Sequence, residues 1–190
     1  MDNRPLILIK HAAPTLVAEV TAEHWQLSEA GRAQCVPLAN RLRPHALTSI
    51  IASTEVKAIE TGQLVARQLG LPFDTGLGLH EHDRSNIPLV PRDEFEAHMA
   101  DFFANPMDLL YGCETAHEAQ SRMRNAVDRT LREYPADTLG IVTHGTVMAL
   151  LLAGPNHLDP FQLWLQLSTP SFAVVTTPDL LIRELVTDVG

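Results

Sequence analysis

Three short apolar runs constrain the fold of this chain more than any other feature. They are LILI at residues 6–9, SIIAS at 49–53 and LGIVT at 139–143. Each run is continuous rather than alternating, which is typical of strands buried on both faces of a parallel sheet. Helical patterns separate the runs. The order of elements therefore predicts an α/β fold, a three-layer sandwich with a mostly parallel central sheet flanked by helices.

The segments between the apolar runs carry helix and loop signals. Helices are expected over 28–42, 54–69, 92–104, 116–133 and 147–153, loops over 15–26 and 71–91, and a terminal pair of strands over 172–177 and 180–186. Thr115 and Glu118 have the spacing of a capping box, in which each side chain accepts a hydrogen bond from the other residue's backbone N–H. Pro178-Asp179 predicts the turn between the last two strands.

Length, charge and cysteine content limit the class of protein. The 190 residues suit one domain over 1–190. The net charge of −9, without a basic run, argues against nucleic acid as a partner. No apolar stretch is long enough for a signal sequence or a membrane span. Cys35 and Cys113 form neither a metal motif nor a disulfide framework. Together with the short apolar stretches, this predicts a cytoplasmic protein without membrane partners. Its oligomeric state is open.

Residues able to bind or react with a ligand stand at or after the ends of all three apolar runs. The polar ones are Lys10, His11, Ser53, Lys57 and His144, and Gly145 follows His144 where a helix opens. Parallel strands place their carboxyl ends at one edge of the sheet, where ligands of α/β proteins bind. Two imidazoles and two ammonium groups would then meet beside a helix N-terminus. Such an arrangement favours an anion.

Six motifs along the chain together resemble those of the histidine phosphatase superfamily, the phosphoglycerate-mutase-like group. In chain order they are LILIKHAAP (6–14), LSEAGRAQ (27–34), IIASTEVKAIET (50–61), LHE (79–81), GCET (112–115) and IVTHGTV (141–147). The resemblance covers nearly the whole chain. It implies a phosphoglycerate-mutase-like fold and hydrolysis of a small phosphorylated substrate, with no cofactor and no metal.

The departures from the family pattern help to distinguish a mutase from a phosphatase. Lys10 and Lys57 stand where the family has two pocket arginines, and Ala12 stands where it has a glycine. The acid loop runs HEHDRSNIP (80–88) and lacks the Trp-Glu-Gly of the mutases. These differences argue against a mutase and favour a small phosphatase-type member whose substrate is unassigned.

The resemblance also implies a role for each site residue. His11 would be the nucleophile that takes the phosphoryl group, and His144 would bond a phosphoryl oxygen. Lys10 and Lys57 would neutralise phosphoryl charge, with Ser53 and Gly145 as further phosphate contacts. Glu81 would protonate the leaving oxygen and later take a proton from the attacking water.

The loop that follows Glu81 offers alternatives. His80 and Asp83 are other candidates for the acid, and Arg84 is a candidate substrate contact.

Two other functions remain open. Lysine is a point charge on a flexible stem, whereas arginine holds two oxygens at once, so the exchanged pocket could bind phosphate or a phosphoester in a regulatory role without turnover. A metal-dependent hydrolase is a weaker alternative. HEH at 80–82 with His11 and His144 could gather an ion, but their spacing matches no compact metal motif.

Overall fold

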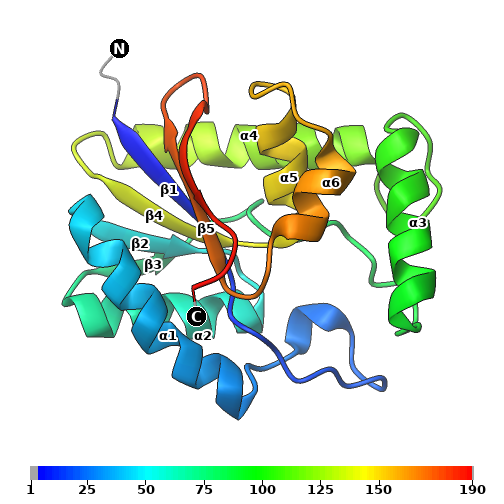
Figure 1. Cartoon of the computed structure of the whole chain (residues 1–190), viewed down its shortest axis with the longest axis horizontal. Coiled ribbons are helices and arrows are strands. Elements are labelled where there is room, and N and C mark those ends of the chain that lie inside the picture. Colours follow the sequence, from blue (N-terminus) through cyan, green and yellow to red (C-terminus); the bar gives the residue numbers. More distant parts are fainter. Residues whose placement is uncertain (1–3, 190) are drawn as a thin grey trace.

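The computed structural model describes residues 4–189, and its centre is a twisted six-stranded sheet (Figure 1). The strands lie in the order β3-β2-β4-β1-β5-β6. Their bounds are β1 Pro5–Lys10, β2 Ser49–Ala52, β3 Phe73–Thr75, β4 Leu139–Thr143, β5 Ser171–Thr176 and β6 Ile182–Val186. The first four in this order are parallel, whereas β5 is antiparallel to β1 and β6 is antiparallel to β5. The expected fold class, a mostly parallel sheet between helices, is confirmed.

Helices cover both faces of the sheet. Their bounds are α1 Glu29–Leu42, α2 Val56–Leu69, α3 Arg92–Ala104, α4 Ala116–Glu133, α5 Gly145–Ala153 and α6 Pro160–Gln166, with 3-10 turns η1 Ala22–His24 and η2 Arg43–His45. Helices α1 and α2 lie on one side of the sheet, and α4, α5 and α6 lie on the other (Figure 1).

The side chains of β1 point alternately to the two faces of the sheet, and this explains why every residue of LILI is apolar. Leu6 and Leu8 belong to the core on the α4–α5 side, whereas Ile7 and Ile9 belong to the core on the α1–α2 side. All four side chains are fully buried. A strand that packs helices on both faces needs apolar residues at every position, so the run itself predicts its place in the middle of the sheet.

Local signals set the helix ends close to where the sequence places them. Ser28 caps α1 by accepting a hydrogen bond from the Gly31 N–H. The expected capping box of Thr115 and Glu118 is present at the start of α4. Gly70 ends α2 in the left-handed conformation, with φ of 71°, that glycine adopts without strain.

The structure adds one strand and one helix to those expected, besides the two 3-10 turns, and it moves several element starts. Strand β3 lies within the predicted loop 71–91; it has three residues and owes its extended form to pairing with β2. Helix α6, which begins after the Asp159 cap, has seven residues, too few for a clear apolar period. Helix α2 begins at Val56 rather than at residue 54. No helix within residues 4–189 is long and apolar enough to cross a membrane.

Candidate functional site

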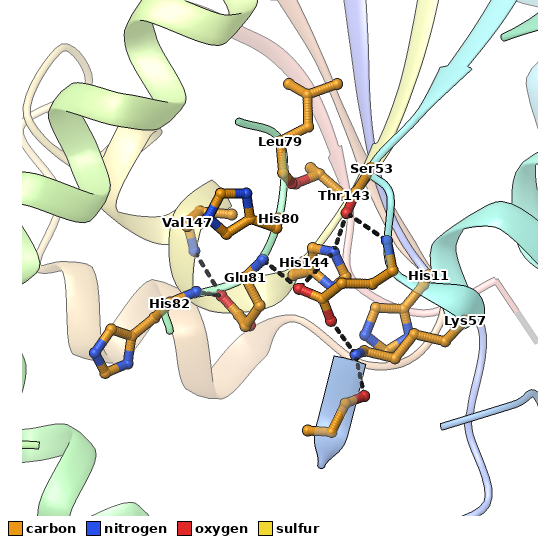
Figure 2. A network of polar contacts seen from close by, with 12 residues as sticks. His11, Ser53, Lys57, Leu79, His80, Glu81, His82, Thr143, His144 and Val147 are labelled. Carbon is orange, nitrogen blue, oxygen red and sulfur yellow. Dashed lines mark hydrogen bonds and ion pairs between the residues drawn. The ribbon is translucent and has the colours of Figure 1, made fainter. Parts of the chain in front are cut away.

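The ends of the three central strands bring the predicted residues to one edge of the sheet. Lys10 at the end of β1 is paired with Thr143 at the end of β4, and the His11 N–H donates to the Thr143 carbonyl at 3.0 Å. On the other side of β4, the Ser53 N–H donates to the Val142 carbonyl at 2.8 Å. These backbone bonds place His11, Ser53 and His144 around one point (Figure 2).

The His11 imidazole is held in one orientation by the chain that follows it. Its Nδ1 lies 2.8 Å from the Ala12 carbonyl oxygen. Because a carbonyl can only accept, Nδ1 carries the hydrogen and a neutral ring has its lone pair on Nε2. Burial, the neighbouring His144 and Lys57 lower the pKa of His11 well below its usual value, so the ring is neutral at pH 7. A neutral imidazole with a free Nε2 is the form that a nucleophile requires.

His144 lies behind His11 and is fully buried. The two ring centroids are 5.1 Å apart. The Nε2 atom of His144 is 2.8 Å from the Ser53 hydroxyl and 3.4 Å from Oε1 of Glu55. Burial, followed by the charge of Lys57, lowers the pKa of His144 well below its usual value. Ser53 therefore contacts His144 directly instead of serving only as a helix cap.

A buried ion pair faces both imidazoles. The Lys57 ammonium, in the first turn of α2, donates to the Ala22 carbonyl at 2.7 Å and to the carboxylate of Glu55. The second oxygen of Glu55 accepts from the Glu81 N–H at 2.6 Å. Burial raises the pKa of Glu55, but the Lys57 charge and these hydrogen bonds outweigh it and lower the pKa below its usual value. An ionised carboxylate thus lies beside the cation expected to meet a phosphoryl group.

The Glu81 carboxylate caps helix α5. It accepts from the N–H groups of Thr146 at 3.1 Å and of Val147 at 3.2 Å, and also from its neighbour His82 at 2.9 Å (Figure 2). Burial raises the pKa of Glu81, but Arg84, His144 and the backbone N–H of His82 outweigh it and lower the pKa to about 2. Without a ligand, this side chain is therefore an ionised carboxylate rather than an acid.

Lys10 lies apart from the ion pair. Its ammonium donates to the Leu167 carbonyl at 2.7 Å. A Cβ at Gly145 would come within 3.0 Å of the Lys10 side chain, so the glycine leaves the room that this lysine occupies. Burial lowers the pKa of Lys10 to about 8.

A cavity of about 410 Å³, here called the strand-end cavity, opens in front of His11. Its lining includes His11, Glu55, Lys57, Glu81 and the loop residues His80, Asp83 and Arg84. The other predicted residues are not part of this lining: Lys10, Ser53, His144 and Gly145. Burial is the main cause that lowers the pKa of His80, whereas the Ser85 N–H lowers that of Asp83.

Two residues important to this geometry were missed by the sequence interpretation. Glu55 lies inside the third motif segment quoted above, IIASTEVKAIET, but a carboxylate before a helix is normally a cap. Arg122 of α4 donates to the carbonyls of Gly78, His80 and Glu81 and pairs with Glu114. The only signal of Arg122 in the sequence is its position next to Met123, one of the apolar residues that α4 buries. Arg122 therefore holds the loop that carries the expected acid.

The histidines suggested as metal ligands do not form a metal site in the described residues. Within the part of the chain that the structure describes, no three His, Cys, Asp or Glu side chains form a group that could hold an ion. The His82 ring, expected to be a possible ligand, packs 4.1 Å from the Phe102 ring, and its Nε2 lies 3.1 Å from the Glu114 carbonyl.

Comparison with known families shows where this chain belongs. Residues 6–178 match the model of the histidine phosphatase superfamily (branch 1), and this span includes all three strand ends and every residue of the cavity lining. The chain therefore belongs to the histidine phosphatase superfamily. A comparison with curated proteins gave no significant match.

Solved structures share the fold over nearly the full length. A mycobacterial glucosyl-3-phosphoglycerate phosphatase is 18% identical with a TM-score of 0.75, and each chain is covered to 97%. A phosphoserine phosphatase from Entamoeba histolytica, bound to 3-phosphoglyceric acid, is 14% identical with a TM-score of 0.77 and the same coverage. YhfR from Bacillus stearothermophilus is 23% identical with a TM-score of 0.71, covering 96% of this chain and 95% of its own. At these identities the likeness establishes the fold and leaves the substrate open.

Proposed function

We propose that this protein hydrolyses phosphomonoesters through a phosphohistidine intermediate on His11. The observation that carries the proposal is the state of the His11 ring. Its Nδ1 is held by the Ala12 carbonyl, its lowered pKa keeps it neutral, and it lines the strand-end cavity. The proposal also rests on membership of the histidine phosphatase superfamily.

In the first step, Nε2 of His11 attacks phosphorus, and the P–O bond to the leaving alcohol breaks. Lys57, which lines the cavity, stabilises the charge on the phosphoryl oxygens, and His144 joins it once its Nε2 turns from the Ser53 hydroxyl toward the phosphoryl group. Glu81 delivers a proton to the leaving oxygen. In the second step, water attacks phosphorus, the N–P bond breaks, and Glu81 takes the water proton, which releases inorganic phosphate and restores His11.

Glu81 must gain a proton when the substrate binds if these two reaction steps are to occur. Glu81 is ionised in the free protein, with a pKa of about 2. A phosphoryl group brings negative charge close to Glu55 and Glu81, and like charges at short range raise carboxyl pKa values. We propose that substrate therefore enters with a proton that Glu81 then holds. His80 and Asp83 line the same cavity and remain the alternative donors.

The pocket cations are already engaged, which weighs against their stabilising a transition state and keeps binding without turnover as a second candidate function. Lys57 is paired with Glu55, and Lys10 donates to the Leu167 carbonyl. A phosphoryl group has to compete with Glu55 for Lys57 and gains Lys10 only if that ammonium turns away from Leu167. A regulatory protein that binds phosphate or a phosphoester without turnover would also have these properties.

Substitution of His11 separates the two functions. We expect His11→Ala to abolish hydrolysis of p-nitrophenyl phosphate and of a panel of phosphoesters, together with acid-labile, base-stable phosphate labelling of the protein. The matched control is His117→Ala, at an exposed position at the start of α4. Labelling that persists in His11→Ala would exclude His11 as the nucleophile.

Two further outcomes belong to the same experiment. Vanadate binding without labelling or turnover in the parent protein would identify the phosphate-binding regulatory function. Dialysis against a chelator is expected to leave turnover unchanged. Loss of turnover that zinc or manganese restores would instead identify a metal-dependent hydrolase.

A further inference from the structure

A second cavity, here called the apolar cavity, continues from the strand-end cavity and encloses about 600 Å³. The two cavities share five lining residues: Thr21, Ala22, Trp25, Arg84 and Ser85. A group attached to a phosphoryl oxygen in the first cavity would therefore extend into the second. The combined space is in the range that proteins use for small organic ligands.

The walls of the apolar cavity are mainly aliphatic and aromatic. One wall is the loop before α1, where Leu16 is 58% exposed and Val20 is 40% exposed. The Trp25 indole N–H donates to the Val17 and Val20 carbonyls at 2.9 and 3.0 Å, so this loop has a fixed shape. Large apolar side chains left open to water at a cavity mark a site for an apolar group.

A further part of the lining comes from the segment before α3, from α3 itself and from Tyr111 in the segment after it. It contains Ile87, Leu89, Phe95 and Tyr111, and Leu89 is 45% exposed. The Phe95 and Tyr111 ring centroids are 6.2 Å apart. Charged side chains in the lining are limited to Glu19, Arg84 and Arg92. The Arg84 guanidinium lies over the Phe95 ring, 4.9 Å from its centroid, at the junction of the two cavities.

We propose that the apolar cavity binds the leaving group of the substrate and selects phosphomonoesters of apolar alcohols over those of small polar ones such as serine or glycerate. This inference rests on the proposed function for the position of the phosphoryl group. A polar leaving group would lose water to aliphatic and aromatic walls that offer few hydrogen-bond partners. An alkyl or aryl group would instead remove apolar surface of both ligand and protein from water.

An alkyl phosphate series tests the proposal, because its members differ in apolar length and hardly at all in leaving-group reactivity. We expect kcat/KM to rise at least tenfold from ethyl through n-butyl to n-octyl phosphate, measured below micelle-forming concentrations. O-phosphoserine should be turned over less well than n-octyl phosphate. A flat series, or a preference for O-phosphoserine, would overturn the inference and leave the phosphatase function in place.

A matched pair of variants locates the effect. Leu89 and Leu158 are 45% and 44% exposed, but only Leu89 lines the cavity. The octyl-to-ethyl ratio of kcat/KM should fall at least fivefold in Leu89→Asp and stay at the parent value in Leu158→Asp. An equal fall in both variants, or in neither, would contradict the assignment of the cavity.

The inference can be tested even if no ester is turned over, which would refute the proposed function. Binding of the same alkyl phosphates is then measured by calorimetry. At least tenfold tighter binding of n-octyl than of ethyl phosphate, lost in Leu89→Asp, would support the apolar cavity as a binding site. Equal binding of the two ligands would overturn it.

Discussion

Glu55 is the side chain in the strand-end cavity that most directly opposes an anion. Its carboxylate pairs with Lys57 and accepts from the Glu81 N–H, and it lies 3.4 Å from Nε2 of His144. A bound phosphoryl group would compete with it for Lys57. Glutamine at this position has nearly the same shape and carries no charge, and its single oxygen can accept from the Lys57 ammonium or from the Glu81 N–H but not from both.

We expect Glu55→Gln to bind sulfate more tightly than the parent by about tenfold at pH 7.5, equivalent to ~1.4 kcal/mol. Sulfate is a suitable probe because it stays a dianion across the pH range. A bound anion raises the pKa of Glu55, so the parent takes up a proton on binding and its affinity rises as the pH falls. The difference between the two proteins should therefore narrow from pH 7.5 to pH 5. Equal affinities at pH 7.5 would show that Glu55 does not oppose the anion.

The two lysines are expected to contribute unequally. Lys57 lines the strand-end cavity, whereas Lys10 is not part of its lining and donates to the Leu167 carbonyl. In a Glu55→Gln background, which avoids an unpaired carboxylate, Lys57→Ala should weaken vanadate binding at least tenfold, or ~1.4 kcal/mol. Lys10→Ala should weaken it less. The Lys10 contribution should also fade as the pH rises through about 8, where its ammonium loses its proton. A larger effect of Lys10→Ala would show that Lys10 turns into the cavity.

At the scale of elements, the loop 78–81 and the N-terminus of α5 stabilise each other. Glu81 accepts from the first N–H groups of α5, and Arg122 of α4 holds the carbonyls of the loop. Helix N-terminal N–H groups have no partners within the helix and favour a negative charge. The same carboxylate is therefore both a structural cap and the proposed proton donor.

We expect Glu81→Gln to lower the free energy of unfolding by about 1–3 kcal/mol at pH 7, because both carboxylate oxygens accept hydrogen bonds, whereas glutamine has one neutral oxygen, so some of these bonds weaken and others are lost. The folded-state pKa of about 2 lies below the unfolded value. The stabilisation by this charge is therefore complete above the unfolded pKa and is lost as the pH falls toward 2. Urea unfolding of both proteins at pH 7 and pH 3.5 measures this, with a smaller difference expected at pH 3.5. An equal difference at both values would show that the cap does not depend on charge.

At the scale of the whole molecule, two core clusters lie on opposite faces of one sheet and share its strands. Adjacent β1 residues enter different clusters, Leu8 on the α4–α5 side and Ile7 on the α1–α2 side. If β1 leaves the sheet, both clusters lose buried side chains and are exposed to water. We therefore propose that residues 1–190 form one domain that unfolds in a single cooperative step.

Unfolding followed by several probes tests this proposal. Tryptophan fluorescence reports on Trp25 and Trp164, far apart in the chain, and circular dichroism reports on all helices. The urea transitions should coincide. Ile7→Ala, at a fully buried position, should shift all of them together by about 2–5 kcal/mol. Leu77→Ala, at a position that is 74% exposed, is the control with little expected change. Separate transitions would indicate more than one domain.

The sequence by itself determined the three central strands of the sheet and the edge at which the candidate site residues meet. Continuous apolar runs such as LILI occur where helices cover both faces, and polar residues after three such strands must meet at one edge because parallel strands share a direction. The caps of α1 and α4 were equally predictable, since Ser28 and Thr115 act within one turn of their own chain. The expected mostly parallel α/β fold follows from these local and periodic signals.

The tertiary structure alone decided which side chains meet and in what ionisation state. Glu55 contacts Glu81 and His144, which lie 26 and 89 positions away, and no local pattern encodes those distances. The same holds for Arg122 and the loop 78–81, and for the two loops that enclose the apolar cavity. The lowered pKa values of His11 and Glu81 arise from burial, neighbouring charges and hydrogen bonds that exist only after folding. Long-range packing sets these quantities because electrostatic interactions depend on separation in space and on exclusion of water, not on separation along the chain.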